Sequence, residues 1–331
     1  MAAGRRPAVH SVRIGLLVAL LAWALAIQAQ APSSHAFDVP PWFGETLLEF
    51  PEEAKDAARE GKRLMIYFGQ DGCPYCRQLM QTSFTQRAIV EKTRRYFVAI
   101  ALDIWGDREV QWFDGRRMSE KELARSLKVQ YTPTLMFVDE KGTSVARLNG
   151  YYPPHRFTAA LDYAAGLAGK GTRFEEYMQT AVKESASPKL HDAPFFRKLP
   201  VQLKGARPVA LLFETPYCSG CDEMHGEGFK RPEVRKLLER FDVYRLSLDD
   251  RRDAMGTWAG ALRVAYTPTL VFFDGGEEVF RVEAYLRPFH LASALEYVAS
   301  GAYRKEPSFQ RFIQARAERM RARGQSVELW E

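Results

Sequence analysis

The chain contains one segment twice: VQYTPTLMFVD at residues 129–139 returns as VAYTPTLVFFD at residues 264–274. Other landmarks recur in the same order. The pair CPYC precedes the first segment and CSGC precedes the second, while NGYYPPHRFTAALDYAAG after the first is echoed by EAYLRPFHLASALEYVASG after the second. Self-similarity at such a separation indicates a duplicated structural unit. We therefore expect two copies of one domain, called here the first and the second copy.

The two copies differ in length at one place. Pro133 recurs as Pro268 at an offset of 135 residues, whereas Cys73 recurs as Cys218 at an offset of 145. The extra residues of the first copy lie around DIWGDREVQWFDGRR, at residues 103–117. Insertions are usually tolerated in surface loops, so we expect a surface loop here.

Composition and the N-terminus suggest an exported globular protein. The 331 residues, 46% hydrophobic and 27% charged, suit two domains with extra segments. Three arginines precede an uncharged apolar run at residues 14–27, and small and polar residues lead to Ala36. This plan predicts a signal peptide at residues 1–36, because the run is too short to span a bilayer comfortably. An uncleaved inner-membrane anchor is the alternative, and membrane contact is then expected only through this segment.

The four cysteines form two CxxC pairs, Cys73 with Cys76 and Cys218 with Cys221. A disulfide across two residues closes a small loop and stabilises a fold little. The pairs are too far apart in the sequence for a zinc ribbon, so we predict no metal site. Without the three N-terminal arginines the net charge of +6 falls to +3, which is too mild to indicate a nucleic-acid partner. The pattern favours redox chemistry.

Each pair is expected where a strand passes into a helix. Residues 63–69, RLMIYFG, and 208–214, PVALLFE, are apolar runs typical of strands, and helical patterns follow both pairs. A helix N-terminus stabilises a thiolate through its unpaired N–H groups. We therefore expect the first cysteine of each pair to be exposed and nucleophilic, and the second to be sheltered one turn inside the helix.

With these landmarks in order, each copy reads strand, helix, strand, helix, hairpin, helix, and the chain resembles the thioredoxin superfamily. The first copy, through GCPYC, DIWGDREVQWFDG, SEKELA, YTPTLMFVDEKG and NGYYPPHRF, resembles SoxW-like periplasmic thioredoxins. The chain departs from cytosolic thioredoxin before each pair, where Gly72 and Tyr217 replace tryptophan. Tyr67 and Leu212 stand where that protein has a buried acid.

The resemblance implies an α/β fold of two tandem thioredoxin domains, each a central mixed sheet flanked by helices. It implies a CxxC at a helix N-terminus, opposite a cis-proline loop. Pro133 and Pro268 would be the cis-prolines, and Thr132 and Thr267 would present backbone groups to an extended substrate segment. We expect boundaries of 37–170 for the first domain, 171–200 for an extra helix and linker, 201–302 for the second domain, and 303–331 for a basic amphipathic helix.

The expected activity is thiol–disulfide exchange. Cys73 would attack a client disulfide and Cys76 would resolve the mixed disulfide, with Cys218 and Cys221 in the same roles in the second copy. No dinucleotide-binding motif occurs, so we expect no cofactor beyond the redox disulfides. In the periplasm, a membrane-embedded thiol donor would supply electrons for disulfide-containing client proteins. The resemblance implies clients in sulfur oxidation or cytochrome maturation.

Three alternatives stay open. The protein could act as a disulfide oxidase or isomerase, although the absence of a positive charge at Tyr75 favours a reductase. The second copy could be an inert scaffold. It could also be a Cu(I) chaperone using Cys218, Cys221, Met224 and His225, ligand types that suit Cu(I). We favour instead a buried core position for Met224 and a surface position for His225.

Neighbouring charges predict a difference between the copies. Arg77 follows the first pair and favours a thiolate, whereas Asp222 and Glu223 follow the second and disfavour one. We therefore expect the thiolate to form more readily at Cys73 than at Cys218.

Overall fold

The computed structural model describes residues 38–181, 184–248 and 254–327, without the side chains of residues 254–257. The predicted signal peptide, residues 1–36, lies outside the described residues. Within the described ranges, no helix combines the length and the apolar character needed to cross a membrane.

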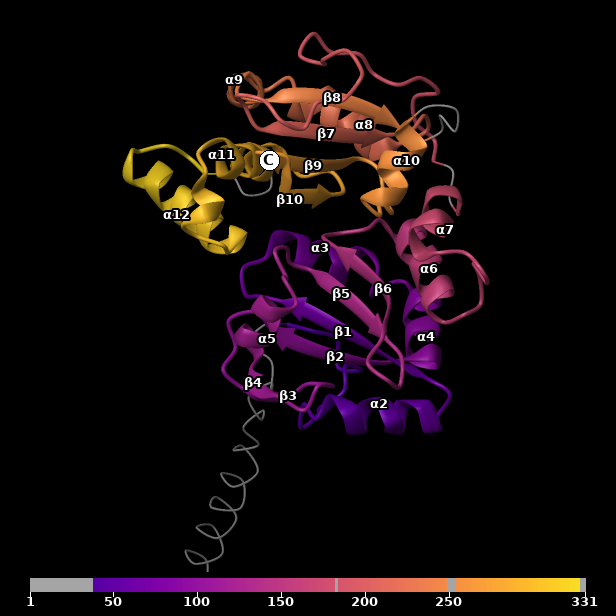
Figure 1. The fold of residues 1–331 in the computed structure, drawn as a ribbon. Helices are drawn as coiled ribbons and strands as arrows, with labels where there is room; N and C mark the ends of the chain where they lie inside the picture. The colour runs from indigo at the N-terminus through magenta and orange to yellow at the C-terminus, as the bar shows by residue number, and fades with distance from the viewer. Residues whose placement is uncertain (1–37, 182–183, 249–253, 328–331) are drawn as a thin grey trace, which may run out of the picture. The chain divides into compact units, whose positions relative to one another are not determined.

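The first copy folds around a four-stranded sheet of order β2-β1-β5-β6 (Figure 1). β1 is parallel to β2 and antiparallel to β5, and β5 pairs antiparallel with β6. Its elements are α2 (Phe50–Arg59), β1 (Arg63–Gly69), α3 (Pro74–Thr82), α4 (Arg87–Tyr96), β2 (Phe97–Asp103), α5 (Glu120–Ser126), β5 (Thr134–Val138), β6 (Ser144–Asn149) and α6 (Pro154–Ala164). From residue 38 onward, helix α2 is the one helix or strand before β1, and the sequence patterns did not predict it.

The second copy repeats the sheet with order β10-β9-β7-β8 and the same parallel and antiparallel pairings. Its elements are β7 (Val209–Glu214), α8 (Ser219–Glu223), a π-helix (Met224–Gly228), α9 (Pro232–Leu238), β8 (Asp242–Ser247), α10 (Ala254–Ala261), β9 (Thr269–Asp274), β10 (Glu277–Glu283) and α11 (Pro288–Ala299). The predicted order of strands and helices is confirmed in both copies.

The central strands are buried on both faces, as expected for runs without polar alternation. In β1, Met65 and Tyr67 join one core, while Leu64, Ile66 and Phe68 join another on the opposite face. Burial on two faces explains why the sequence shows a continuous apolar run there. It also holds the end of the strand, and the cysteine pair that follows, in a fixed place.

The insertion of the first copy is more ordered than the surface loop that we expected. Residues 109–111 and 117–119 form a two-stranded antiparallel sheet, β3 (Glu109–Gln111) with β4 (Arg117–Ser119). Val110 and Trp112 are buried in the core that also contains Phe50 of α2. The loop prediction is wrong because these apolar side chains cover the sheet face that α2 and α5 share.

An extra helix follows each copy. Helix α7 (Phe174–Thr180) follows the first copy, and helix α12 (Phe309–Ala322) follows the second. Phe309, Phe312 and Ile313 of α12 are buried, which confirms the apolar face predicted for this basic helix. Arg316 on the same helix is also buried, with ion pairs to Glu233 and Glu296.

The two copies share one hydrophobic core. A single cluster of buried side chains runs from Met65 and Leu135 in the first copy to Leu212 and Leu270 in the second, and includes Phe309 of α12. The cluster includes Cys73 and Cys76 of the first copy and, in the second copy, Met224, which follows the second cysteine pair.

Candidate active sites

The first cysteine pair lies where β1 passes into α3. Cys73 is the N-cap residue of α3, is disulfide-bonded to Cys76, and its sulfur accepts a hydrogen bond of 3.1 Å from the Cys76 N–H. Pro74 occupies the first helical turn, where a missing N–H is tolerated. The Cys73 sulfur lies 3.3 Å from the Thr132 carbonyl oxygen. The Thr132–Pro133 bond is cis, so the first site combines the residues that the sequence predicted.

The second pair repeats this geometry. Cys218 caps α8, is disulfide-bonded to Cys221, and accepts a hydrogen bond of 3.1 Å from the Cys221 N–H. The Thr267–Pro268 bond is cis. A Cβ placed on Gly220 would lie 2.9 Å from Pro268 Cδ, so this cysteine pair also faces the proline of its own copy.

Neither of the cysteines expected to be nucleophiles, Cys73 and Cys218, is exposed, contrary to the sequence expectation. The exposed fraction is 7% for Cys73 and 1% for Cys218. The first pair borders a cavity of about 30 Å³ that residues of the second copy and of α12 close. These residues include Tyr285, Leu286, His290, Phe309, Gln310 and Ile313. The exposure prediction is wrong because it treated each copy as an isolated domain.

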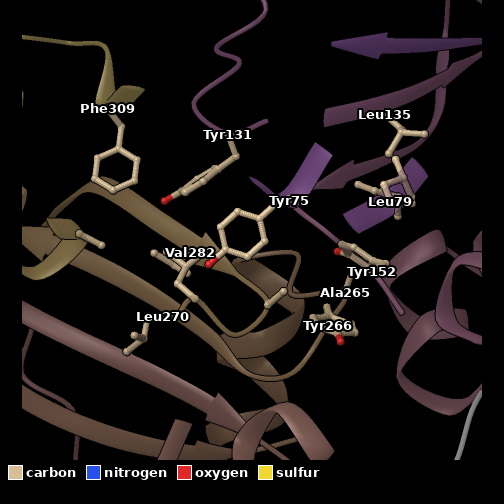
Figure 2. Close-up of a cluster of buried hydrophobic side chains, with 14 of the residues drawn as sticks. Tyr75, Leu79, Tyr131, Leu135, Tyr152, Ala265, Tyr266, Leu270, Val282 and Phe309 are labelled. Carbon is tan, nitrogen blue, oxygen red and sulfur yellow. The ribbon is translucent and has the colours of Figure 1, made fainter. Parts of the chain in front are cut away.

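Tyr75, the third residue of CPYC, shows how the first pair is covered. Its hydroxyl accepts a hydrogen bond of 3.0 Å from the backbone N–H of Arg287, and its ring packs edge-on against His290. Burial raises the pKa of the Tyr75 phenol. Figure 2 shows Tyr75 and Tyr131 of the first copy beside Val282 and Phe309. The Tyr131 ring packs against the Phe309 ring at a tilt, with ring centroids 5.5 Å apart, so α12 contacts the YTP segment directly.

Gln70 connects three parts of the first site. Its amide donates to Thr132 Oγ1 at 3.0 Å and to Gln310 Oε1 of α12 at 2.8 Å, and its carbonyl accepts from Trp105 Nε1 at 2.6 Å. The sequence analysis did not identify Gln70. Its position three residues before Cys73, at the end of a buried strand, is the signal that could have indicated it.

The linker between the copies covers the second pair. The Tyr217 N–H donates to the Ser187 carbonyl at 2.7 Å, and Asp222 accepts from the Ser187 N–H at 2.9 Å and pairs with His191 at 2.6 Å. Burial opposes ionisation of Asp222, but the hydrogen bonds from His191 and Ser187 outweigh it and lower the pKa of that carboxyl. The linker therefore has a defined geometry that its mixed composition did not indicate.

Glu184, an acid of the linker, contacts the residue that follows Cys218. Its carboxylate accepts from the Ser219 N–H at 2.8 Å and the Ser219 hydroxyl at 2.5 Å, and pairs with Arg156 at 2.8 Å and His155 at 2.9 Å. Burial opposes its ionisation, yet the hydrogen bonds from His155, Ser219 and Arg156 lower the pKa of Glu184 to about 2. No sequence pattern links Glu184 to the CSGC pair, because the contact depends on the path of the linker.

The geometry of the second copy does not support the alternative of Cu(I) binding. Met224 is fully buried in the shared core, as we expected. His225 was expected on the surface, but its side chain is only 8% exposed and hydrogen-bonds to the buried carboxylate of Glu214 at 2.8 Å. In the part of the chain that the structure describes, no group of three or more His, Cys, Asp or Glu side chains could hold a metal ion.

Two disulfides, each between the N-cap of a helix and its first turn and each facing a cis-proline, define a protein built for thiol–disulfide exchange. Comparison with known proteins agrees with this interpretation of the two sites. The model of the thioredoxin-like domain family matches residues 50–165 and again residues 198–299, so the chain belongs to the thioredoxin-like domain family.

Individual relatives are more distant. The chain is 27% identical over 158 residues to the thiol:disulfide interchange protein DsbD of Actinobacillus pleuropneumoniae serotype 5b (strain L20), a match that covers 45% of this chain and 25% of that protein. Among solved structures, a thioredoxin from Thermus thermophilus is 27% identical, with 37% of this chain and 92% of that chain covered and a TM-score of 0.29. A thioredoxin-fold protein from Helicobacter pylori is also 27% identical, with coverages of 32% and 70% and a TM-score of 0.29.

Proposed function

We propose that both copies are redox-active and that the protein reduces disulfides in exported client proteins. Cys73 attacks the client disulfide, the client thiolate leaves, and a mixed disulfide forms. Cys76 then attacks Cys73, which releases the reduced client and restores the Cys73–Cys76 disulfide. Cys218 and Cys221 act in the same way. The placement of each pair at a helix start beside its own cis-proline is the observation that carries this proposal.

Thr132 with Pro133, and Thr267 with Pro268, serve as the platforms for the client backbone. The Thr132 carbonyl lies 3.3 Å from the Cys73 sulfur, so a client segment paired with this residue brings its disulfide within reach. Because both platforms are covered in the structure, a client must displace the covering residues before exchange.

The wider setting is also a proposal. The signal-type segment at residues 1–36 supports export to the periplasm, where a membrane-embedded thiol protein supplies electrons. The partial match to DsbD is compatible with such a setting. The clients we propose are SoxW-type clients in sulfur oxidation or cytochrome maturation. We also propose that the first domain spans residues 37–170, the extra helix and linker 171–200, the second domain 201–302, and the basic C-terminal helix 303–331.

The reduction potential of each pair tests the direction of transfer. Two full-length variants, Cys73→Ser/Cys76→Ser and Cys218→Ser/Cys221→Ser, each leave one pair, which is equilibrated with defined ratios of reduced and oxidised dithiothreitol. A reductase is expected to show a potential near that of thioredoxin, about −270 mV. Values near about −120 mV, at the oxidising end of the range, would assign the protein to disulfide formation instead.

A further inference from the structure

The two cysteine pairs differ at the residue after the first cysteine. In the first pair this residue is Pro74, which has neither an N–H nor a hydroxyl to offer an anion. In the second pair it is Ser219, whose N–H and hydroxyl both donate to one carboxylate oxygen of Glu184. A carboxylate is therefore anchored beside Cys218, and the same anchor cannot form beside Cys73.

The carboxylate of Glu184 is held firmly. Only 6% of its side chain is exposed, and its second oxygen is bound by Arg156 and His155 at the start of α6, in the first copy. The Arg156 guanidinium is itself buried, lies 4.9 Å from the centre of the Tyr266 ring, and donates to the Met178 carbonyl. In water-excluded surroundings the charges of Glu184 and Arg156 act on neighbouring groups with little screening.

We propose that Glu184 is a positioning residue that makes the Cys218–Cys221 pair more strongly reducing, by placing a fixed negative charge at the residue next to Cys218. This inference rests on the proposed redox role of the second copy. The charge disfavours the Cys218 thiolate, and Glu184 also takes the two Ser219 donors that could otherwise stabilise a thiolate. A less stable reduced form shifts the equilibrium towards the disulfide, which is the opposite of the case in strongly oxidising relatives.

Dithiothreitol gives two electrons and two protons, its own disulfide forms, and the Cys218–Cys221 bond breaks. One proton goes to Cys221, and the other goes to Cys218 or, where Cys218 stays a thiolate, to solvent. Glu184 acts only on the thiolate, so its effect must grow with pH.

Other charged and titratable groups surround this site. Among the described residues they include His155 and Arg156 of α6, Asp222 and Glu223 of α8, His191 of the linker, His225, Glu227, Arg287, and Tyr266 before the second cis-proline. Arg156 offers the most useful comparison with Glu184, because its positive charge has the opposite effect on a thiolate. Removing either charge breaks the same buried ion pair, but the two changes act on a thiolate with opposite signs.

The test uses the full chain with Cys73→Ser/Cys76→Ser, and measures the equilibrium constant for reduction of Cys218–Cys221 by dithiothreitol at pH 6 and pH 9. Glu184→Gln is expected to raise this constant about tenfold at pH 9, which corresponds to about 30 mV for a two-electron couple, and to leave it unchanged at pH 6. Arg156→Gln is expected to lower the constant at pH 9. Glu176→Gln, an exposed acid on α7, is the control and should change neither value.

If the ion pair has only a structural role, the reduction equilibrium constant of the two variants should change in another way. Loss of the pair would then move the constant in the same direction in both variants, or by equal amounts at both pH values, and either result would overturn the inference. An unchanged constant in Glu184→Gln at pH 9 would overturn it as well. If the disulfide fails to equilibrate with dithiothreitol even in the parent chain, the redox role of the second copy is refuted, and this inference with it.

Discussion

At the scale of single residues, Gly220 allows the second cysteine pair to approach its cis-proline. The rigid ring of Pro268 lies where a Cβ on Gly220 would point, at 2.9 Å, and Tyr285 Cβ lies 3.5 Å from the same position. In the first pair the corresponding residue is Tyr75, whose hydroxyl instead contacts Arg287. The glycine in CSGC is therefore required by close packing.

Gly220→Ala is expected to destabilise the protein by about 1–3 kcal/mol, the usual effect of overpacking, and to slow exchange at the second pair. Urea unfolding and the rate of reduction by dithiothreitol measure the two effects. Gly226→Ala is the matched control, since no atom lies within 4 Å of its added Cβ. Equal stability of the two variants would show that the proline loop can move aside at no cost.

His290 makes stability depend on pH. It is buried beside Tyr75, and its Nδ1 atom has no hydrogen-bond partner among the described residues. Burial, helped by the nearby charge of Arg316, lowers the pKa of His290 to about 4. The unfolded chain therefore binds a proton at this residue between about pH 6.5 and pH 4 while the folded chain does not, so stability falls as the pH drops through this window.

Acidification from pH 7 to pH 5 is expected to cost roughly 1–2 kcal/mol through this residue, since one pKa unit corresponds to about 1.36 kcal/mol. His290→Leu should remove that part of the pH dependence. Urea unfolding of both proteins at pH 8, 7 and 5 provides the measurement, and between pH 8 and pH 7 the two should change in parallel. If both also lose the same stability between pH 7 and pH 5, His290 is protonated in the folded protein.

At the scale of elements, α12 acts as a cover over the first cysteine pair. Phe309 and Gln310 hydrogen-bond to Gln130, and Gln310 and Ile313 border the cavity beside Cys73. Ile313 contributes apolar burial, whereas Glu318 on the same helix is exposed. The helix therefore offers a matched pair of positions for testing the cover.

Ile313→Ala is expected to weaken the packing of α12 by about 2–5 kcal/mol, the range for loss of a buried isoleucine side chain. Local opening then becomes more frequent, and dithiothreitol should reduce Cys73–Cys76 at least several-fold faster in the Cys218→Ser/Cys221→Ser chain. Glu318→Ala should leave the rate unchanged. An unaltered rate in Ile313→Ala would mean that reductants reach Cys73 without movement of α12.

Local elements were predictable because their signals are local. The apolar run at residues 63–69 was correctly predicted as a strand and forms β1. The cover over the cysteines was not predictable. Glu184 and Ser219 are 35 residues apart, and Tyr75 and Arg287 are 212 apart, so their contacts exist only through tertiary packing.

At the scale of the whole molecule, the shared core joins the two copies into one structural unit. Tyr152 of the first copy is 1% exposed, and its ring packs at a tilt against Tyr266 of the second, with ring centroids 4.5 Å apart. Tyr131 of the first copy donates its hydroxyl to the Arg281 carbonyl of β10 at 2.6 Å. Both tyrosines of the repeated YTPTL segments thus contact the other copy, and covering the sites contributes to stability.

This arrangement predicts that the two copies unfold together. Tyr152→Ala should lower the free energy of unfolding by about 3–5 kcal/mol, as for other large buried aromatic residues, and should lower the protection of β1 and β7 alike. Urea unfolding followed by hydrogen exchange in the two strands measures this, with Tyr217→Ala, half exposed, as the control. Separate transitions for β1 and β7 in the parent chain would contradict cooperative unfolding. A single shared transition would mean that a client opening one site also loosens the packing around the other, because the same contacts cover both.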